Sequence, residues 1–306
     1  MSYELQRDEE IGKGLRRICR KQIEAAIEVA KGERECASSA VWQTRKHLKR
    51  ARAVLRLGHS VLDHQAAFWD EEKLLRDAAR LISDIRDAEV RLETVRDLQN
   101  TALRRARFSE VEAMLMMELQ NFVAAFAEWQ SESVPLLEKA LAGIARVPFE
   151  RLGYDELCAA VRHSYKCARK AVADAQEKLT PECAHRLRRK AKALCFQLRI
   201  VRPTNPVVLK ELSDELGSVA SMLGRAHDLS FLGERLRTTG RNERWSREAE
   251  QLLPSVQVTE TDLQTAAVEL AAHFFAESPG DFAQRICDWL RKWVRNERQS
   301  LAEQLL

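Results

Sequence analysis

Two basic stretches organise this sequence: VWQTRKHLKRARAVLR, residues 41–56, and AHRLRRKAKALCFQLR, residues 184–199. They align with a single offset, because 143 residues separate Arg45 from Arg188 and also Lys49 from Lys192. Neither stretch contains Asp or Glu. Both carry apolar residues at helical spacing, so the sequence predicts two matched basic helices that face one shared polyanion.

Each predicted helix has a basic face and an apolar face. On a helical wheel of about 100° per residue, the basic stripe of the first helix contains Arg45, Lys49, Arg52 and Arg56. The stripe of the second contains His185, Arg188, Lys192 and Arg199. The opposite faces, with Leu48 in the first helix and Leu187 in the second, are apolar and must turn toward a core.

The uncompensated charge of the stripes needs a physical explanation. Each like-charge pair at a spacing of three or four residues costs roughly a few tenths of a kcal/mol. A phosphate chain along the stripe would offset that cost, since each charge-assisted contact contributes about 1.5–3 kcal/mol. The alternative is that the stripes are solvated surface, or that they pair with acidic residues on neighbouring helices.

Positive charge is concentrated in this chain rather than abundant. The 306 residues include 50 Lys and Arg against 46 Asp and Glu, which gives a net charge of only +4. Six of the basic residues lie in residues 41–56 and seven lie in residues 184–202, so the remainder of the chain is net acidic. Concentrated positive charge creates a local field that attracts anions.

The seven cysteines indicate reduced thiols. Their number is odd and no two have the C-x-x-C spacing, which argues against a secreted disulfide framework and against a structural zinc site. The chain starts without an apolar export signal, and no window approaches the roughly 18 apolar residues of a membrane span. We therefore expect a cytoplasmic protein without membrane contact, cofactor or metal.

Strong helix formers, with only 11 Gly and 7 Pro, predict an all-α fold. Apolar periodicity predicts eight helices in two sets of four. The first set covers about residues 9–31, 39–57, 71–98 and 108–141. The second covers about residues 155–177, 182–201, 207–237 and 260–303, with a break near Pro279. Residues 238–259 are predicted to form a loop insertion with a short helical piece inside it.

A second pair of matching segments favours an internal repeat. Residues 86–93, RDAEVRLE, match residues 227–234, HDLSFLGE, and 141 residues separate Asp87 from Asp228. Similar offsets in two separate helices favour duplication of a whole four-helix unit, for which antiparallel packing with short loops is the economical arrangement. The predicted architecture is one domain, residues 1–306, made of half-bundles 1–147 and 148–306.

The basic pattern in both halves resembles the CHAD family, the conserved histidine α-helical domains. The pattern is His-x-x-Arg-x-x-x-(Arg/Lys)-(Arg/Lys), followed by a further basic residue and then by the Arg86-Asp87 or His227-Asp228 helix. The resemblance covers nearly the whole chain. It implies two four-helix bundles related by a pseudo-twofold axis, with a basic groove or pore between them. It also implies binding of inorganic polyphosphate and an association with polyphosphate granules.

The resemblance carries the anion-contacting stripe onto particular positions of this chain. In the first half these positions are Arg45, Lys49, Arg50 and Arg52. In the second half they are His185, Arg188, Arg189 and Lys192. Two departures from the family pattern are Trp42 in place of a histidine and Cys195 in place of a basic residue. The first departure leaves His185 as the only motif histidine, which argues against a mechanism that needs a symmetric histidine pair.

Further site residues follow from the stripes and from the outer helices. Arg56 and Arg199 continue the two basic stripes. Arg20 and Arg169 lie in similar basic segments of the first and fifth predicted helices, and we expect them to extend the basic lining. The role of His185 stays open between anion contact, a structural or solvated position, and covalent phosphorylation or metal binding.

Three functions remain after these observations. The favoured hypothesis is non-enzymatic binding of inorganic polyphosphate, in the cytoplasm and at polyphosphate granules. The second is RNA or tRNA binding by the same surface, although aromatic residues, which stack on bases, are only 6% of the chain. The third is a phosphoanhydride-processing enzyme with His185 as nucleophile. No acidic spacing suited to Mg²⁺ and no E-x-E-x-K motif supports it, so no catalytic residue is predicted. The oligomeric state is not predicted.

Overall fold

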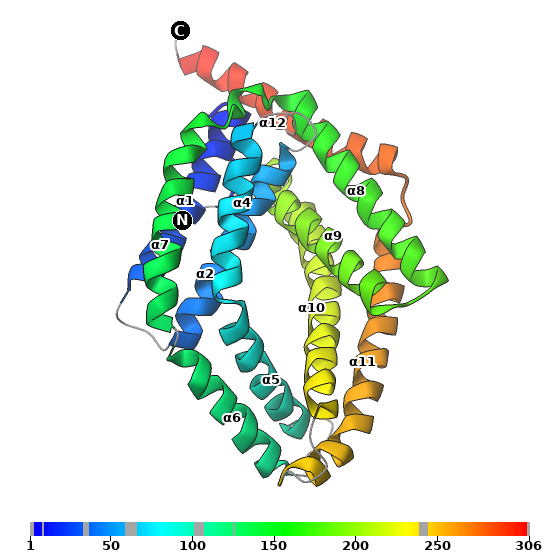
Figure 1. Ribbon diagram of the computed structural model, residues 1–306. Coiled ribbons are helices and arrows are strands. Elements are labelled where there is room, and N and C mark those ends of the chain that lie inside the picture. The colour runs from blue at the N-terminus through cyan, green and yellow to red at the C-terminus, as the bar shows by residue number, and fades with distance from the viewer. Residues whose placement is uncertain are drawn as a thin grey trace.

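The computed structural model (Figure 1) describes residues 3–7, 9–32, 37–58, 66–100, 107–124, 126–238 and 244–304. Within these ranges the protein is built from 11 α-helices and three short 3-10 helices, without any strand. The prediction of an all-α fold is therefore confirmed. None of the described helices is long and apolar enough to cross a membrane.

Six described helices occupy residues 11–143. They are α1 (Ile11–Lys31), α2 (Ala37–Leu57), α4 (Ala66–Leu81), α5 (Ser83–Asn100), α6 (Ser109–Val123) and α7 (Phe126–Gly143). Helix α1 packs against α2 and α7, and α4 packs against α7 and α2, so these four helices share one core. Helices α5 and α6 pack against each other and continue away from it (Figure 1).

The second part of the chain begins with two 3-10 turns, η1 (Ile144–Arg146) and η2 (Phe149–Arg151). Its remaining elements are α8 (Tyr154–Glu177), α9 (Pro181–Ile200), η3 (Arg202–Thr204), α10 (Pro206–Arg237), α11 (Ser246–Phe274) and α12 (Pro279–Gln304). Helix α9 packs between α8 and α10, α10 also packs on α11, and α12 covers α8. The division into half-bundles 1–147 and 148–306 and their pseudo-twofold relation stay predictions.

Two helices expected to be continuous are divided. The segment predicted as 71–98 consists of α4 and α5, which meet at Ile82, and the segment predicted as 108–141 consists of α6 and α7. At the first break the Ser83 hydroxyl donates a hydrogen bond of 2.7 Å to the carbonyl of Arg80, which competes with regular helix bonding. Neither break contains Gly or Pro, so periodicity alone could not detect them.

The expected loop insertion at 238–259 is wrong. Helix α11 starts at Ser246 and runs through Pro254 without interruption, so most of the expected loop is helical. Apolar packing offsets the proline, because Ala249, Leu252 and Val256 are buried in one cluster with apolar residues of α10. The break expected near Pro279 is confirmed, since α11 ends at Phe274 and α12 begins at Pro279.

The two parts of the chain are joined by packing and by polar contacts. One buried apolar cluster includes residues of α1, α2, α8, α9 and α12, and a second unites α5, α6, α10 and α11. Glu118 of α6 forms ion pairs with Arg91 of α5 at 2.9 Å and with Arg235 of α10 at 2.6 Å. These contacts hold α5 and α10 side by side (Figure 1), which fixes the positions of the helices that they support.

The cysteines do not all remain thiols. Cys158 of α8 and Cys287 of α12 form a disulfide, with their Cα atoms 5.7 Å apart. The prediction of reduced thiols is therefore wrong for this pair, whose members are separated by 129 residues in the sequence. The free cysteines in the described part of the chain are Cys19, Cys167, Cys183 and Cys195. Cys36 lies outside the described residues.

The contact between α1 and η2 requires a glycine at position 12. A Cβ atom added to Gly12 would lie 2.1 Å from the backbone oxygen of Phe149, which cannot move without shifting η2. We expect Gly12→Ala to lower the free energy of unfolding by about 2 kcal/mol, as overpacking does. Urea denaturation measures this change.

The matched control is Gly233→Ala within α10. There the nearest atom to the added Cβ, Cγ1 of Val256, would be at an ordinary 3.5 Å. We expect this variant to be neutral or stabilised by up to about 1 kcal/mol, because alanine favours helix more than glycine does. Equal stability of the two variants would contradict the packing described for α1 and η2.

Candidate anion-binding site

The apolar faces of α2 and α9 fix the direction of their basic faces. Leu48 and Leu55 of α2 and Leu187 and Leu194 of α9 are buried in the same apolar cluster. Helix α9 starts at a defined residue, because the Thr180 hydroxyl accepts a hydrogen bond from the amide of Cys183 and Pro181 occupies the first turn. The basic stripes therefore lie on the faces opposite the core, as their periodicity predicted.

The two basic helices contact each other, and charged residues of one lie near charged residues of the other. Lys46 lies within electrostatic range of Arg199, and Arg56 lies within range of Arg189. These proximities are reciprocal under the 143-residue offset, since Lys46 aligns with Arg189 and Arg56 with Arg199. The structure thus brings the two stripes together rather than leaving them on separate exteriors.

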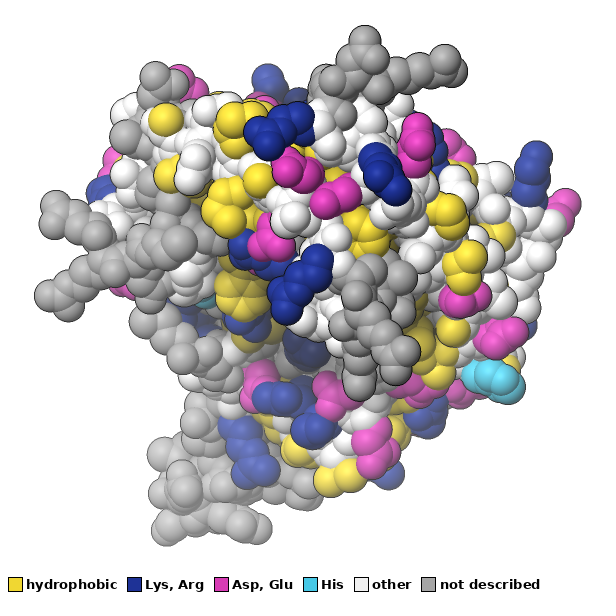
Figure 2. Space-filling view, turned by 90° about the horizontal axis from the view of Figure 1, so that it is seen from below, with side chains coloured by type: hydrophobic (Ala, Val, Ile, Leu, Met, Phe, Trp, Pro, Cys, Tyr) yellow, Lys and Arg dark blue, Asp and Glu magenta, His cyan; other side chains and the backbone are white. Residues whose placement is uncertain are grey.

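Four cations form the middle of the site, which we call the central cluster: Arg45, Lys49, Arg188 and Lys192. Burial and the neighbouring charges of Arg45, Arg188 and Lys192 lower the pKa of Lys49 to about 8. The Lys49 side chain nevertheless remains exposed to water. Figure 2 shows Lys and Arg side chains around the recessed middle of the face that it displays.

The members of the central cluster form no ion pair within the part of the chain that the structure describes. Among the described residues, no carboxylate oxygen lies within 4.0 Å of a basic nitrogen of its four members. Asp87 of α5 and Asp228 of α10 lie farther away, and burial raises the pKa of each. Arg45 opposes that rise at Asp87, and Arg188 opposes it at Asp228. The matched segments of α5 and α10 thus place one acid near an arginine of each basic helix.

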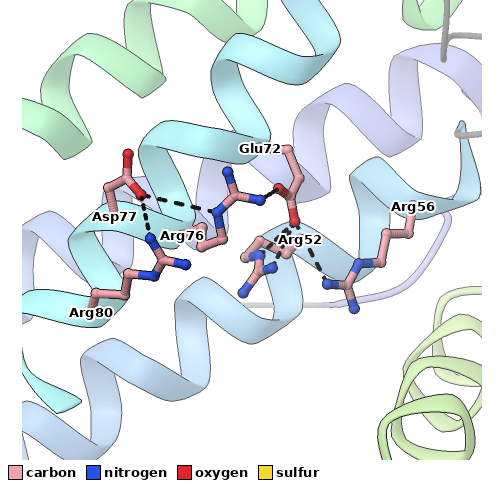
Figure 3. Close-up of polar contacts among 6 residues, drawn as sticks. All are labelled: Arg52, Arg56, Glu72, Arg76, Asp77 and Arg80. Atoms are coloured by element: carbon pink, nitrogen blue, oxygen red, sulfur yellow. Dashed lines mark hydrogen bonds and ion pairs between the residues drawn. The ribbon is translucent and has the colours of Figure 1, made fainter. Parts of the chain in front are cut away.

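The outer members of the stripes are compensated. Arg52 donates two hydrogen bonds to Glu72 of α4, at 3.0 and 2.7 Å, and Arg56 lies 3.6 Å from the same carboxylate (Figure 3). In α9, Arg199 lies 3.9 Å from Asp214. For these residues the alternative of acidic partners on neighbouring helices holds in part, whereas it does not hold for the central cluster.

Arg50 of α2 and Arg189 of α9 are predicted site residues outside the central cluster. The Arg50 guanidinium is 5.3 Å from the centre of the Tyr3 ring, and the Tyr3 hydroxyl donates to the Arg50 carbonyl at 3.1 Å. Burial lowers the pKa of Arg50. Arg189 is exposed on α9, and the Lys192 ammonium lies 5.3 Å from the Phe196 ring.

His185 faces a second histidine. Its ring centre lies 5.4 Å from that of His227 on α10. Burial lowers the pKa of both imidazoles, and the neighbouring cations lower it further, Arg188 acting on both. His227 therefore supplies a histidine to the site from a different helix, which the motif alone did not reveal.

Two expected members of the lining lie on other helices. Arg20 of α1 is paired with Glu24 at 2.8 Å and lines a surface hollow of about 440 Å³ with other basic residues of α1. Arg169 is exposed on α8, within electrostatic range of Tyr165. Within the described residues, no ion pair, hydrogen bond or electrostatic contact joins either residue to the central cluster.

The two departures from the family pattern have different surroundings. Trp42 is 48% exposed, and the Lys46 ammonium lies 4.7 Å from its ring centre in a cation–π contact. Cys195 is buried and its thiol donates to the Ser213 carbonyl at 3.2 Å. Trp42 thus stays on the basic side of α2, whereas Cys195 belongs to the core.

Sequence reasoning missed a glycine that makes room for the site. A Cβ atom at Gly224 of α10 would lie 3.3 Å from Nε of Arg188, closer than most side chains pack. The absence of a side chain there lets the Arg188 guanidinium lie against the α10 backbone. The available signal was a glycine inside a long helical pattern, which often marks a close approach.

Comparison with known proteins identifies the family of this chain. The family model of the CHAD domain matches residues 17–237. The chain therefore belongs to the CHAD family. The crystal structure of the CHAD domain from the plant Ricinus communis matches with a TM-score of 0.60 and 18% sequence identity, over 90% of this chain and 95% of that chain. At that identity the likeness shows the fold alone. No curated protein matches the chain.

Repulsion inside the central cluster makes a prediction about stability. We expect Lys49→Met to raise the free energy of unfolding by about 0.5–1 kcal/mol at low salt, because it removes one of several crowded cations. The gain should disappear at high salt, where screening weakens repulsion. Denaturation at the two salt concentrations measures it.

Lys210→Met is the matched control, because the Lys210 ammonium is paired with Asp214 at 2.7 Å. It should bring no gain at either salt concentration. If both variants respond alike, the central cluster is not under repulsion.

Proposed function

We propose that this protein binds inorganic polyphosphate without cleaving or extending it. In this proposal the central cluster forms the middle of a basic groove between the two parts of the chain. The observation that carries the proposal is the position of Lys49. Its ammonium is crowded by four other cations and has no carboxylate within ion-pair distance among the described residues. A linear polyanion is the ligand that would relieve this repulsion along its whole length.

The side chains of the site suit phosphate. The planar guanidinium forks of Arg45 and Arg188 can each take two phosphate oxygens, and Lys49 and Lys192 add mobile point charges. A long chain engages both basic helices at once and should bind more tightly than a short one. Affinity should also fall steeply with salt, because binding releases the condensed counterions of the polyanion.

Family membership supports the same ligand, because CHAD domains are known in general as polyphosphate-binding domains. The proposal includes a binding role without catalysis. It locates the protein in the cytoplasm, at polyphosphate granules, where long chains are concentrated.

RNA remains the second candidate, and one observation favours it. The exposed Trp42 ring beside Lys46 and the basic stripe resembles the aromatic platforms on which single-stranded bases stack. A single platform beside many cations favours phosphate recognition over base recognition. Competition between the two polyanions therefore belongs in the test.

Paired substitutions test the proposed site. We expect Arg45→Ala with Lys49→Ala, and separately Arg188→Ala with Lys192→Ala, each to weaken long-chain polyphosphate binding at least tenfold, since each removes two charge-assisted contacts. Binding isotherms at fixed salt measure the affinities. We expect the variants to stay folded, because all four side chains lie on the face opposite the apolar core. Thermal unfolding checks this expectation.

The control is Lys13→Ala with Arg96→Ala, which removes the same charge from exposed residues paired with Glu10 and Glu112. Long-chain polyphosphate should displace bound tRNA, and polyphosphate incubated with the protein and Mg²⁺ should keep its length. Parental affinity in both cluster variants would place the ligand elsewhere. If tRNA displaces polyphosphate but polyphosphate does not displace tRNA, the protein is an RNA-binding protein. Shortening of the polyphosphate would indicate an enzyme.

A further inference from the structure

A group of arginines surrounds one carboxylate at the end of the basic stripe of α2. Glu72 of α4 accepts hydrogen bonds from Arg52, at 3.0 and 2.7 Å, and from Nη1 of Arg76 at 3.4 Å. Arg56 approaches the same carboxylate at 3.6 Å. Figure 3 shows the three guanidinium groups, from two different helices, pointing toward Glu72. We call Arg52, Arg56, Arg76 and Glu72 the Glu72 cluster.

The Glu72 cluster has more positive charge than an ordinary ion pair. Three guanidinium groups share one carboxylate, which leaves a charge of +2 before neighbours are counted. The next acid, Asp77, lies 4.0 Å from Nε of Arg76 and is itself shared with Arg80 at 3.7 Å. A pair that served only stability would be balanced, because each unpaired like charge is repelled by its neighbours.

Burial differs between the carboxylate and the arginines. The Glu72 side chain is only 8% exposed, whereas those of Arg56 and Arg76 are 36% and 41% exposed. Each guanidinium carries five N–H donors, and one carboxylate offers about four lone-pair sites. Donors therefore remain on the solvent side while the acid lies beneath them. This arrangement orients guanidinium groups for an outside anion.

The Glu72 cluster is continuous with the basic helix of the second half. Arg56 lies within electrostatic range of Arg189 on α9. Eleven residues along α2 separate Arg56 from Arg45 of the central cluster, a distance of roughly 16 Å at the rise of an α-helix. A linear anion that lies along α2 from Arg45 therefore reaches Arg56, at the far side of the Glu72 cluster, only if it contains several phosphates.

We propose that the Glu72 cluster is a second phosphate seat, in which Arg76 of α4 contacts the ligand beside Arg52 and Arg56, and Glu72 acts as the positioning residue. This inference rests on the proposed function and deepens it. It adds Arg76, which lies outside the basic stripes, to the binding surface. It also gives the site a means to distinguish long chains from short ones.

The test compares Arg76→Gln with Arg80→Gln, which removes the same charge from the same helix one turn further on. Both variants and the parent are titrated with tripolyphosphate and with a polyphosphate of about one hundred units over a range of salt concentrations. We expect Arg76→Gln to weaken long-chain binding three- to tenfold and to lower the salt slope by about 1. Tripolyphosphate affinity and Arg80→Gln should stay at the parental values.

Further variants distinguish a role of Arg76 in binding from a role in folding. They also distinguish a failure of this inference from a failure of the proposed function. Arg76→Lys keeps the charge and should recover most of the long-chain affinity, and thermal unfolding verifies that each variant is folded. If Arg76→Gln and Arg80→Gln bind long chains equally, or if Arg76→Gln weakens both ligands alike, the second seat is wrong. Those results leave the proposed function intact as long as the Arg45 and Lys49 double variant loses binding. If the parent itself fails to bind, the proposed function fails first.

Discussion

Electrostatic repulsion between α2 and α9 is the constraint around which this molecule is arranged. Apolar residues such as Leu48 and Leu194 bury these helices in one core, and the helices contact each other. Their basic faces are then forced together, because a helix that buries one face must present the other. The hydrophobic packing of the core offsets this repulsion, and an anion would remove it.

Compensation is graded along the basic stripes. At the centre, Lys49 and its cationic neighbours lack a carboxylate within ion-pair distance in the described structure, and Asp87 and Asp228 lie farther away. At the outer ends, Glu72 and Asp214 approach Arg56 and Arg199. Such grading keeps the outer guanidinium groups oriented while the strongest positive potential stays in the middle. Under the proposed function, this grading would draw an anionic ligand first to the central cluster and then along α2.

The features that could be predicted from sequence are those encoded by local periodicity. The stripes of α2 and α9, the all-α fold and the position of the α11–α12 break follow from spacing and proline chemistry. Long-range partners could not be predicted. Glu72 lies 20 residues from Arg52, His227 meets His185 only across helices, and Cys158 and Cys287 are 129 residues apart. Where packing overrides a local signal, as at Pro254, periodicity predicts a loop and the protein forms a helix.

The titration of the Lys49 ammonium tests the convergence of the two stripes most directly. Side-chain NMR of isotope-labelled lysine, assigned with Lys49→Arg, follows this group as the pH is raised. Because burial and four nearby cations disfavour the charged form, the pKa of Lys49 should be about 8 in the free protein and should move upward when long-chain polyphosphate is added. A free-protein value near the usual 10.4 of lysine, unchanged by polyphosphate, would show that the two basic helices do not converge on one ligand.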